Sequence, residues 1–276
     1  MDVTPMLTTV VNGGPVCLEN IAGILSLTMP TALRDHAVVV SGIASGTSGV
    51  AASRKLPGQP CPTPTLGNPN PPAAVWATSP VGSYANNGET INTTDGYRAF
   101  VIPTLAVDRS GGPTDGNIAV AWHSGGFFSS LNVAYSADVK NGGSTWSAVD
   151  PPPPASGAQH NLPRVANSPA GVVAVLYYQD TLTGSTPLTA QYLAAKNAGQ
   201  PSWGSPATLS VPFSPANMFH QTGDVFIGDY VGLTFDPSGN ALATWADGRN
   251  DRSDIYFESV SSTPGIAPCP GCVAGH

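Results

Sequence analysis

The segments Gly116-Asn-Ile-Ala-Val-Ala-Trp122 and Gly239-Asn-Ala-Leu-Ala-Thr-Trp245 decide the fold, because each combines a turn with a strand. Both begin with Gly-Asn, which favours a tight turn, and continue through small apolar residues to a tryptophan six positions after the glycine. Gly171 to Tyr177 repeats the pattern with tyrosine in the tryptophan position, and Gly49 to Lys55 is a weaker copy. The four turn glycines follow at intervals of 55 to 68 residues, a length that suits a four-stranded unit with its loops.

Further strands are expected on both sides of these segments. Short apolar runs precede the turn glycines, at 37–40, 101–107, 165–166 and 231–235. A third strand follows: Tyr135 and Trp146 are eleven residues apart, and Tyr192 and Trp203 repeat that spacing. We therefore expect four units, at about 31–98, 99–160, 161–215 and 216–262.

Each unit is expected to be a small antiparallel sheet, and neighbouring sheets must cover its faces because no helical segment is evident. Radial stacking provides this cover, so the predicted fold is an all-β propeller of four-stranded antiparallel blades over residues 31–262. A β-sandwich is the alternative architecture. Residues 1–30 are expected to be an N-terminal extension, with 7–11 as an outer strand of the last unit, and residues 263–276 a tail containing Pro and Cys.

Composition excludes several classes of partner. The 276 residues contain 10 Lys and Arg against 17 Asp and Glu, so no basic surface is large enough for nucleic acid. The longest apolar stretch, 16–33, is interrupted by Glu19 and Pro30, so we predict no membrane span. No basic segment precedes this stretch, and we recognise no signal peptide.

Four cysteines, Cys17, Cys61, Cys269 and Cys272, occur in a chain rich in Ser, Thr, Asn and Gly. This pattern fits an extracellular or cell-surface protein with one or two disulfides. Cys269-Pro-Gly-Cys272 has the spacing of a redox motif or of half a zinc site, but the chain offers no second pair. A structural disulfide or an unpaired tail is therefore the favoured interpretation.

Two stretches resemble a known repeat. Ser136-Ala-Asp138 followed by Gly142-Gly-Ser-Thr145-Trp146 resembles the Asp box, with extra residues between Asp and Gly, and Ile227 to Asn240, continuing to Arg249 and Tyr256, is similar to blades of bacterial sialidases. Tyr97-Arg98-Ala-Phe-Val-Ile-Pro103 is similar to the Arg-Ile-Pro motif, with an insertion. The chain thus resembles the Asp-box (bacterial neuraminidase repeat) sialidase-like β-propeller superfamily. The resemblance implies up to six blades, of which four are legible, and structural roles for Asp138 and Trp146.

A ligand site in such a propeller is expected where first strands begin and second strands end, segments that include His123, His160 and Asp180. The resemblance implies three arginines for a substrate carboxylate, a tyrosine nucleophile with a glutamate, and an aspartate as acid and base. Candidate catalytic residues are Tyr230, Asp35 and Asp229; candidate substrate-binding residues are Arg34, Arg98, Arg249, His36 and Tyr97, of which Tyr97 is also a candidate nucleophile. In the structural alternative, Asp247 pairs with Arg249 within its loop, and Asp229-Tyr230 anchors a strand.

Two functions follow from these observations. The first is a non-catalytic propeller that binds glycans or proteins, or serves as an extracellular surface or assembly module with further chains. The alternative is an exo-sialidase-type retaining glycoside hydrolase acting on an acidic sugar. The incomplete Asp boxes and the scarcity of glutamate, with Glu19, Glu89 and Glu258 alone, favour the first. We expect no cofactor or metal, because the histidines lack ligand spacing and no loop has a calcium pattern.

Overall fold

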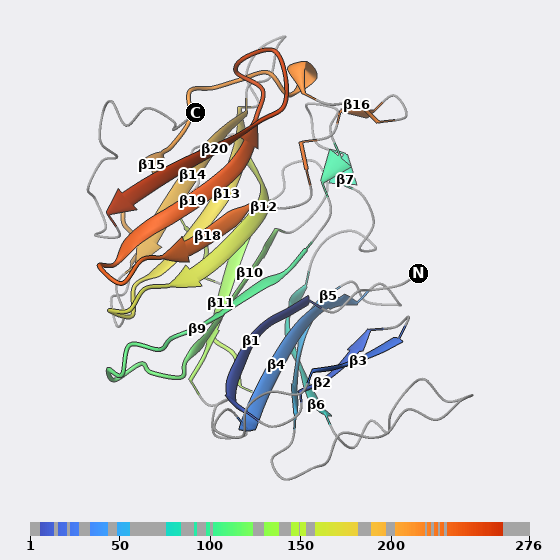
Figure 1. The fold of residues 1–276 in the computed structure, drawn as a ribbon, viewed down its shortest axis with the longest axis vertical. Coiled ribbons are helices and arrows are strands. Elements are labelled where there is room, and N and C mark those ends of the chain that lie inside the picture. The colour runs from blue at the N-terminus through green and yellow to red at the C-terminus, as the bar shows by residue number, and fades with distance from the viewer. Residues whose placement is uncertain are drawn as a thin grey trace.

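A computed structural model shows an all-β chain built from antiparallel sheets (Figure 1). It describes residues 6–13, 16–20, 23–27, 34–43, 49–55, 76–83, 91–92, 98–99, 102–123, 130–137, 145–148, 150–152, 158–181, 189–196, 202–218, 220–221, 224–225, 227–228 and 231–261. Before residue 100 the description covers strand backbones and one side chain, that of Val81. Within these ranges the helical content is a single 3-10 turn, Pro215–Asn217. The predicted all-β class is confirmed.

Four main sheets follow one another in chain order, from the first sheet in blue to the last in orange and red (Figure 1). The first has the order β1-β4-β5-β6, formed by Met6–Gly13, Arg34–Ile43, Gly49–Lys55 and Trp76–Ser83. The second has the order β11-β10-β9, formed by Leu131–Ser136, Ile118–His123 and Thr104–Val107. Over the described residues these sheets do not close into a ring.

The third and fourth sheets hold most of the described side chains. The third has the order β12-β13-β14-β15, formed by Ala158–Asn167, Val173–Thr181, Thr189–Lys196 and Ala207–Thr208. The fourth has the order β18-β19-β20, formed by Gly232–Phe235, Asn240–Asp247 and Asp254–Ser261. Two-stranded pairs complete the described strands: β2-β3 (Val16–Asn20, Gly23–Leu27), β7-β8 (Ile91–Asn92, Arg98–Ala99) and β16-β17 (His220–Gln221, Asp224–Val225).

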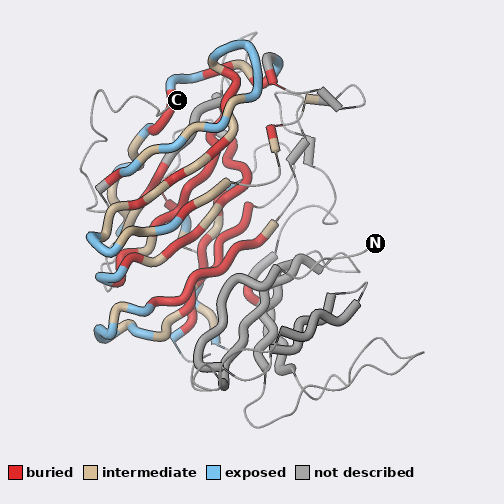
Figure 2. The backbone as a smooth tube through the Cα atoms, viewed as in Figure 1, coloured by how far each residue is buried: buried red, intermediate tan, exposed pale blue. Residues whose placement is uncertain are grey.

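The turn glycines of the repeat lie just before the second strand of three sheets. Gly116, Gly171 and Gly239 have φ values of 79°, 80° and 85°, a left-handed conformation that glycine adopts without steric cost. Each donates its backbone N–H to a carbonyl of the preceding strand end, those of Asp108, Ser168 and Asp236, at 2.8 to 3.0 Å. Figure 2 shows exposed residues at these turns, which lie at one end of the sheets.

In two units, the segment with the repeated Tyr–Trp spacing forms the outer edge of the sheet. After β11, the N–H groups of Ser147 and Asp150 bond the carbonyls of Tyr135 and Val133, both at 2.8 Å. After β14, the short strand β15 pairs with Tyr192 and Leu193. The Trp203 indole donates to the Asp150 carbonyl at 3.1 Å and so connects the two units. Asp138 of the Asp-box-like segment lies outside the described residues, whereas Trp146 is half-buried.

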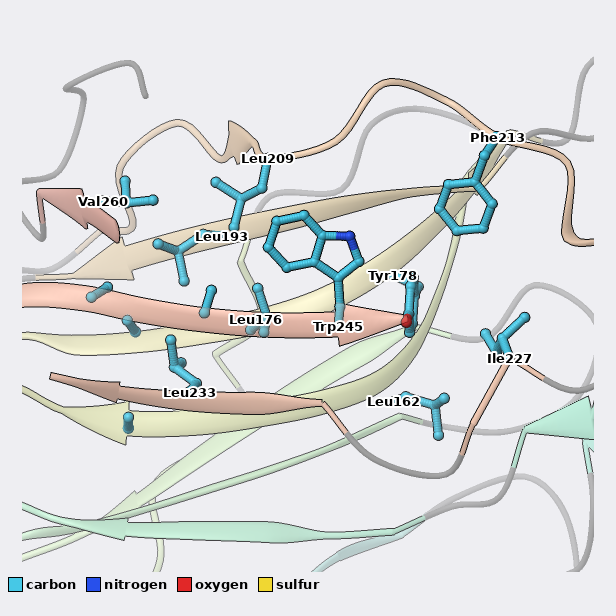
Figure 3. Close-up of a cluster of buried hydrophobic side chains, with 14 of the residues drawn as sticks. Leu162, Leu176, Tyr178, Leu193, Leu209, Phe213, Ile227, Leu233, Trp245 and Val260 are labelled. Carbon is cyan, nitrogen blue, oxygen red and sulfur yellow. The ribbon is translucent and has the colours of Figure 1, made fainter. Parts of the chain in front are cut away.

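Apolar side chains fill the spaces between the second, third and fourth sheets. Leu176 and Leu193 of the third sheet share a buried cluster with Trp245 and Val260 of the fourth (Figure 3). A second cluster joins Val133 of the second sheet to Val175 of the third. The two repeat tryptophans, Trp122 and Trp245, are both buried. The stacking of sheets is thus maintained by the alternating apolar residues of the repeat.

The pairing of the N-terminal strand differs from the sequence prediction. Strand β1 pairs antiparallel with β4, from Met6 opposite Val40 to Gly13 opposite Arg34, and therefore belongs to the first sheet. The expectation that residues 7–11 complete the last unit was wrong about the partner strand. Strand β4 and the outer strand of the last unit, β20, both contain apolar residues, and sequence alternation does not distinguish them as partners. No helix in the described part of the chain has the length and apolar character of a membrane span.

Candidate functional site

The structure describes the predicted site residues to different extents. Tyr97, Asp229 and Tyr230 lie outside the described residues. The backbones of Arg34, Asp35 and His36 begin β4, and Arg98 begins β8, opposite Asn92. Of the predicted site residues, Arg249 has a described side chain. Convergence of the three arginines on one ligand therefore stays a prediction.

Arg249 is engaged with an aspartate of its own loop, as the structural alternative proposed. The side chain of Asp247 is fully buried and accepts the backbone N–H of Arg249 at 2.8 Å and its Nε at 2.9 Å. Arg249 Nη2 donates to the same carboxylate, and the Trp245 indole donates to it at 3.2 Å. The carboxylate thus fixes the guanidinium plane at the end of β19.

One face of the Arg249 guanidinium lies on an aromatic ring. Arg249 Cζ is 3.9 Å from the ring centroid of Tyr256, which in turn stacks on Trp245 at 6.3 Å. Asn250 Nδ2 donates to the Tyr256 hydroxyl at 2.7 Å. The Arg249 side chain remains 24% exposed and Asn250 is exposed, so this group presents polar atoms to solvent. We call Arg249, Asn250 and Tyr256 the arginine shelf.

Close packing holds this loop in place at Gly248. A Cβ atom at this position would lie 2.8 Å from Cγ of Met218 and 3.2 Å from the carbonyl oxygen of Ser214. Both contacts are shorter than normal van der Waals separations, and one involves backbone. The loop that carries Arg249 is therefore seated against residues 213–218, and position 248 requires glycine.

Beside the shelf, buried polar side chains gather at the sheet ends opposite the tight turns. They lie at the last residues of β10, β13 and β19 and at the first residues of β12, and we call them the strand-end cluster: His123, Gln159, His160, Asn161, Gln179, Asp180 and Asp247. These seven are the majority of the twelve buried polar side chains in the described residues. A buried polar group lowers stability unless it is hydrogen-bonded, so their concentration requires a specific network.

Cross-strand hydrogen bonds order the cluster in the third sheet. His160 faces Gln179 across β12 and β13, with Nε2 at 3.2 Å from Oε1, and Asn161 Nδ2 donates to Asp180 Oδ2 at 2.9 Å. The His160 ring meets the edge of Tyr177 at 5.2 Å between centroids. Burial lowers the pKa of His160, and its hydrogen bond with Gln179 opposes that shift. A neutral imidazole is the form that this site stabilises.

Tyr178 connects the cluster to the arginine shelf. Its hydroxyl donates to the carbonyl of Ala246 at 2.7 Å and accepts the N–H of the same residue at 3.1 Å. Burial raises the pKa of Tyr178, and the nearby Asp247 and Asp180 carboxylates raise it further, against the hydrogen bond to Ala246. The phenol therefore stays protonated and serves as a link between β13 and β19, not as a nucleophile.

His123 is the most isolated member of the cluster. It is fully buried at the end of β10, and neither ring nitrogen has a hydrogen-bond partner in the described part of the structure. Burial lowers its pKa from 6.5 to about 3. The imidazole is consequently neutral in the folded protein at neutral and mildly acidic pH.

We expect acid to destabilise the protein through His123. Its folded-state pKa, about 3, is below the unfolded value of 6.5, so the unfolded chain binds the proton first and stability falls as the pH drops through this window. The loss approaches about 1.4 kcal/mol per pH unit, or about 2 kcal/mol by pH 5. Urea unfolding at pH 7 and pH 5 measures this loss. Between these pH values, the free energy of unfolding of His123→Leu should fall by about 2 kcal/mol less than that of the unsubstituted chain. Equal losses in both proteins would show that His123 does not titrate this way.

Sequence reasoning identified part of this cluster. The expected ligand-site segments included His123, His160 and Asp180, whereas Gln159 and Gln179 were missed. A usable signal was present: the buried run Val172 to Tyr178 ends abruptly in Gln-Asp, which leaves two polar groups inside a strand. Among the described residues, no group of three or more His, Cys, Asp or Glu side chains is placed to hold a metal ion.

Comparisons with known proteins give little further guidance. No family model and no curated protein matches the sequence. Among solved structures, the chain is similar to a protein of unknown function from Dyadobacter fermentans DSM 18053, with a TM-score of 0.39 and 12% sequence identity. The match covers 82% of this chain and 57% of that one, so this chain spans little more than half of its length. At this level of similarity the comparison assigns neither a family nor a function.

Proposed function

We propose that the protein is a non-catalytic, glycan-binding β-propeller of the sialidase-like type, which binds its ligand at the arginine shelf beside the strand-end cluster. The observation that carries this proposal is the concentration of buried polar side chains at one end of the sheets. At the opposite end, fewer polar side chains are buried, those of Asp108, Ser136 and Ser168, and Asp108 and Ser168 accept backbone N–H groups of the turns themselves. Function is the usual reason for a fold to keep polar groups in a costly position.

The strand-end cluster holds the strands that carry the arginine shelf in a fixed arrangement. An unsatisfied buried polar group costs about 1–3 kcal/mol, so the bonds from Asn161 to Asp180 and from Tyr178 to Ala246 hold their strands in one arrangement. Asp247 belongs to both groups, because it is buried in the cluster and fixes the guanidinium of Arg249. Donors and acceptors that are fixed before binding lose little entropy when a ligand arrives.

The exposed groups suit a sugar. A sugar hydroxyl both donates and accepts hydrogen bonds, and the Asn250 amide and the Arg249 guanidinium supply fixed planar partners. Tyr256 supports both side chains, because its ring lies under the Arg249 guanidinium and its hydroxyl accepts the Asn250 amide. The guanidinium also favours an acidic sugar, since it retains N–H groups beyond the two that contact Asp247.

Two features favour binding without hydrolysis. Tyr178, which feels the Asp247 and Asp180 carboxylates of the cluster, is held as a protonated phenol. The Tyr256 hydroxyl accepts the Asn250 amide at 2.7 Å, whereas an activated nucleophile would need a carboxylate as proton acceptor. We also propose an extracellular or cell-surface location, from the cysteine content and the low lysine content.

A glycan microarray with sialylated, sulfated and neutral sugars tests the proposal, followed by calorimetric titration of the best ligand. Arg249→Gln is expected to weaken binding tenfold or more, about 1.4 kcal/mol. Arg252→Gln is the matched control, because Arg252 lies in the same loop but its side chain is 74% exposed and pairs with Asp254. Circular dichroism verifies that both variants are folded. No binding to any sugar, or equal effects of the two variants, would contradict the proposal.

A fluorogenic sialoside assay separates binding from hydrolysis. The protein is expected to release no fluorophore at any pH, with an active sialidase as the positive control. Release that is abolished by Tyr230→Phe in folded protein would instead establish the retaining glycoside hydrolase, with the tyrosine as nucleophile.

A further inference from the structure

Strand β20 at the end of the last sheet exposes large apolar side chains. Ile255 is 77% exposed and Phe257 is 51% exposed, and both lie on the face that points away from the third sheet. Tyr256, Glu258 and Val260 alternate with them toward the interior. Exposed isoleucine and phenylalanine at alternate positions of one strand are typical of an interaction surface.

The outer edge of the same strand is open in the described structure. The third strands of the two preceding sheets are covered on this edge, β14 by β15 and β11 by the segment that contains Ser147 and Asp150. Strand β20 pairs with β19 from Asp254 to Ser261, and no described residue pairs with its other edge. Its eight residues include no proline, lysine or bulge, and beyond Asp254 at its first position the inward-facing Glu258 is the one charge within it that opposes edge-to-edge pairing.

We propose that two copies of this chain associate through β20, forming an antiparallel pair around a two-fold axis at Phe257. A two-fold axis perpendicular to the sheet keeps the exposed faces of both copies on the same side. Phe257 then lies opposite Phe257 of the second copy, and Ile255 lies opposite Ser259. The pairing extends the last sheet across both copies and buries the edge N–H and C=O groups of the two strands.

The charges of β20 disfavour the two registers next to this one. A pair centred on Tyr256 would place Asp254 opposite Glu258, and a pair centred on Glu258 would place the two glutamates opposite each other. Like charges directly opposite in a sheet are destabilising. The pair centred on Phe257 places Glu258 opposite Tyr256 and Asp254 opposite Val260, so no carboxylates face each other. The aromatic pair at the axis adds further stabilisation.

Sedimentation velocity on the full chain over a range of concentrations tests this association. We expect a monomer–dimer equilibrium whose dissociation constant rises at least tenfold in Phe257→Lys. Val211→Lys is the matched control and should leave the equilibrium unchanged, because Val211 is also apolar and 58% exposed but lies outside the strands. A monomer at every concentration, or a dimer that Phe257→Lys leaves intact, would overturn the proposal.

A charge-exchange pair tests the register. Ile255→Glu should weaken the dimer, and adding Ser259→Lys should restore it, because the new glutamate and lysine face each other across the two-fold axis. Failure of this rescue in folded protein would overturn the Phe257-centred pairing. Hydrogen exchange of β20 tests whether the chain's own tail, residues 262–276, covers the edge instead of a second copy. If the β20 amides were protected in a monomer and lost this protection when residues 262–276 were deleted, the tail would be the partner. That result would also overturn the proposal.

Discussion

Replacing Asp247 by alanine is expected to destabilise the protein by about 3 kcal/mol, because it removes a fully buried carboxylate that accepts charge-assisted hydrogen bonds from the Arg249 guanidinium. The substitution also removes the acceptor for the Arg249 backbone N–H and for the Trp245 indole. Asp247→Asn should cost less, since the amide oxygen still accepts one or two of these bonds. Urea unfolding monitored by tryptophan fluorescence measures the difference.

The exposed pair Arg252–Asp254 provides the control for this experiment. Its atoms are 2.9 Å apart, but the Arg252 side chain is 74% exposed, and water screens such a pair. Asp254→Ala should therefore leave the unfolding curve almost unchanged. A small effect of Asp247→Ala, comparable to that of Asp254→Ala, would mean that the end of β19 is not the ordered site that we describe.

Trp245→Ala is expected to destabilise the protein by a similar amount, about 3–5 kcal/mol, because it leaves a large cavity between the third and fourth sheets. The indole is 3% exposed and packs with Leu176 and Leu193 (Figure 3), and it also stacks on Tyr256. Loss of this contact should also release the ring beneath Arg249, so ligand affinity should fall with stability.

Trp245→Phe keeps part of the apolar volume and should retain more of the stability than Trp245→Ala. Chemical unfolding of both variants, with Val211→Ala as an exposed apolar control, gives the comparison. If Trp245→Ala unfolded at the same urea concentration as Val211→Ala, the stacking of the last two sheets would not depend on the repeat tryptophan.

The local features of the fold could be predicted from sequence because they depend on nearby residues. The glycines at 116, 171 and 239 are required by left-handed turn positions, and alternation predicted the strands that follow them. The bond between Asp247 and Arg249 was also predictable, since two residues separate the partners.

Features that depend on distant residues could not be predicted in this way. The partner of β1 is chosen by packing between strands more than twenty residues apart, and local alternation contains no information about it. Similarly, Tyr178 reads as one more apolar strand residue, and its role becomes evident only when β19 brings the Ala246 backbone to its hydroxyl. Gln179 faces His160 for the same reason.

Hydrogen exchange measured with and without a bound glycan tests the central claim, that the ligand site lies at the strand-end cluster and the arginine shelf. Binding is predicted to slow exchange in residues 158–161, 177–180 and 245–252, which carry the cluster and the shelf. Exchange at the turns of Gly116, Gly171 and Gly239 should remain unchanged, because they lie at the other end of the sheets. Protection at those turns, with none at the cluster, would contradict the proposed site.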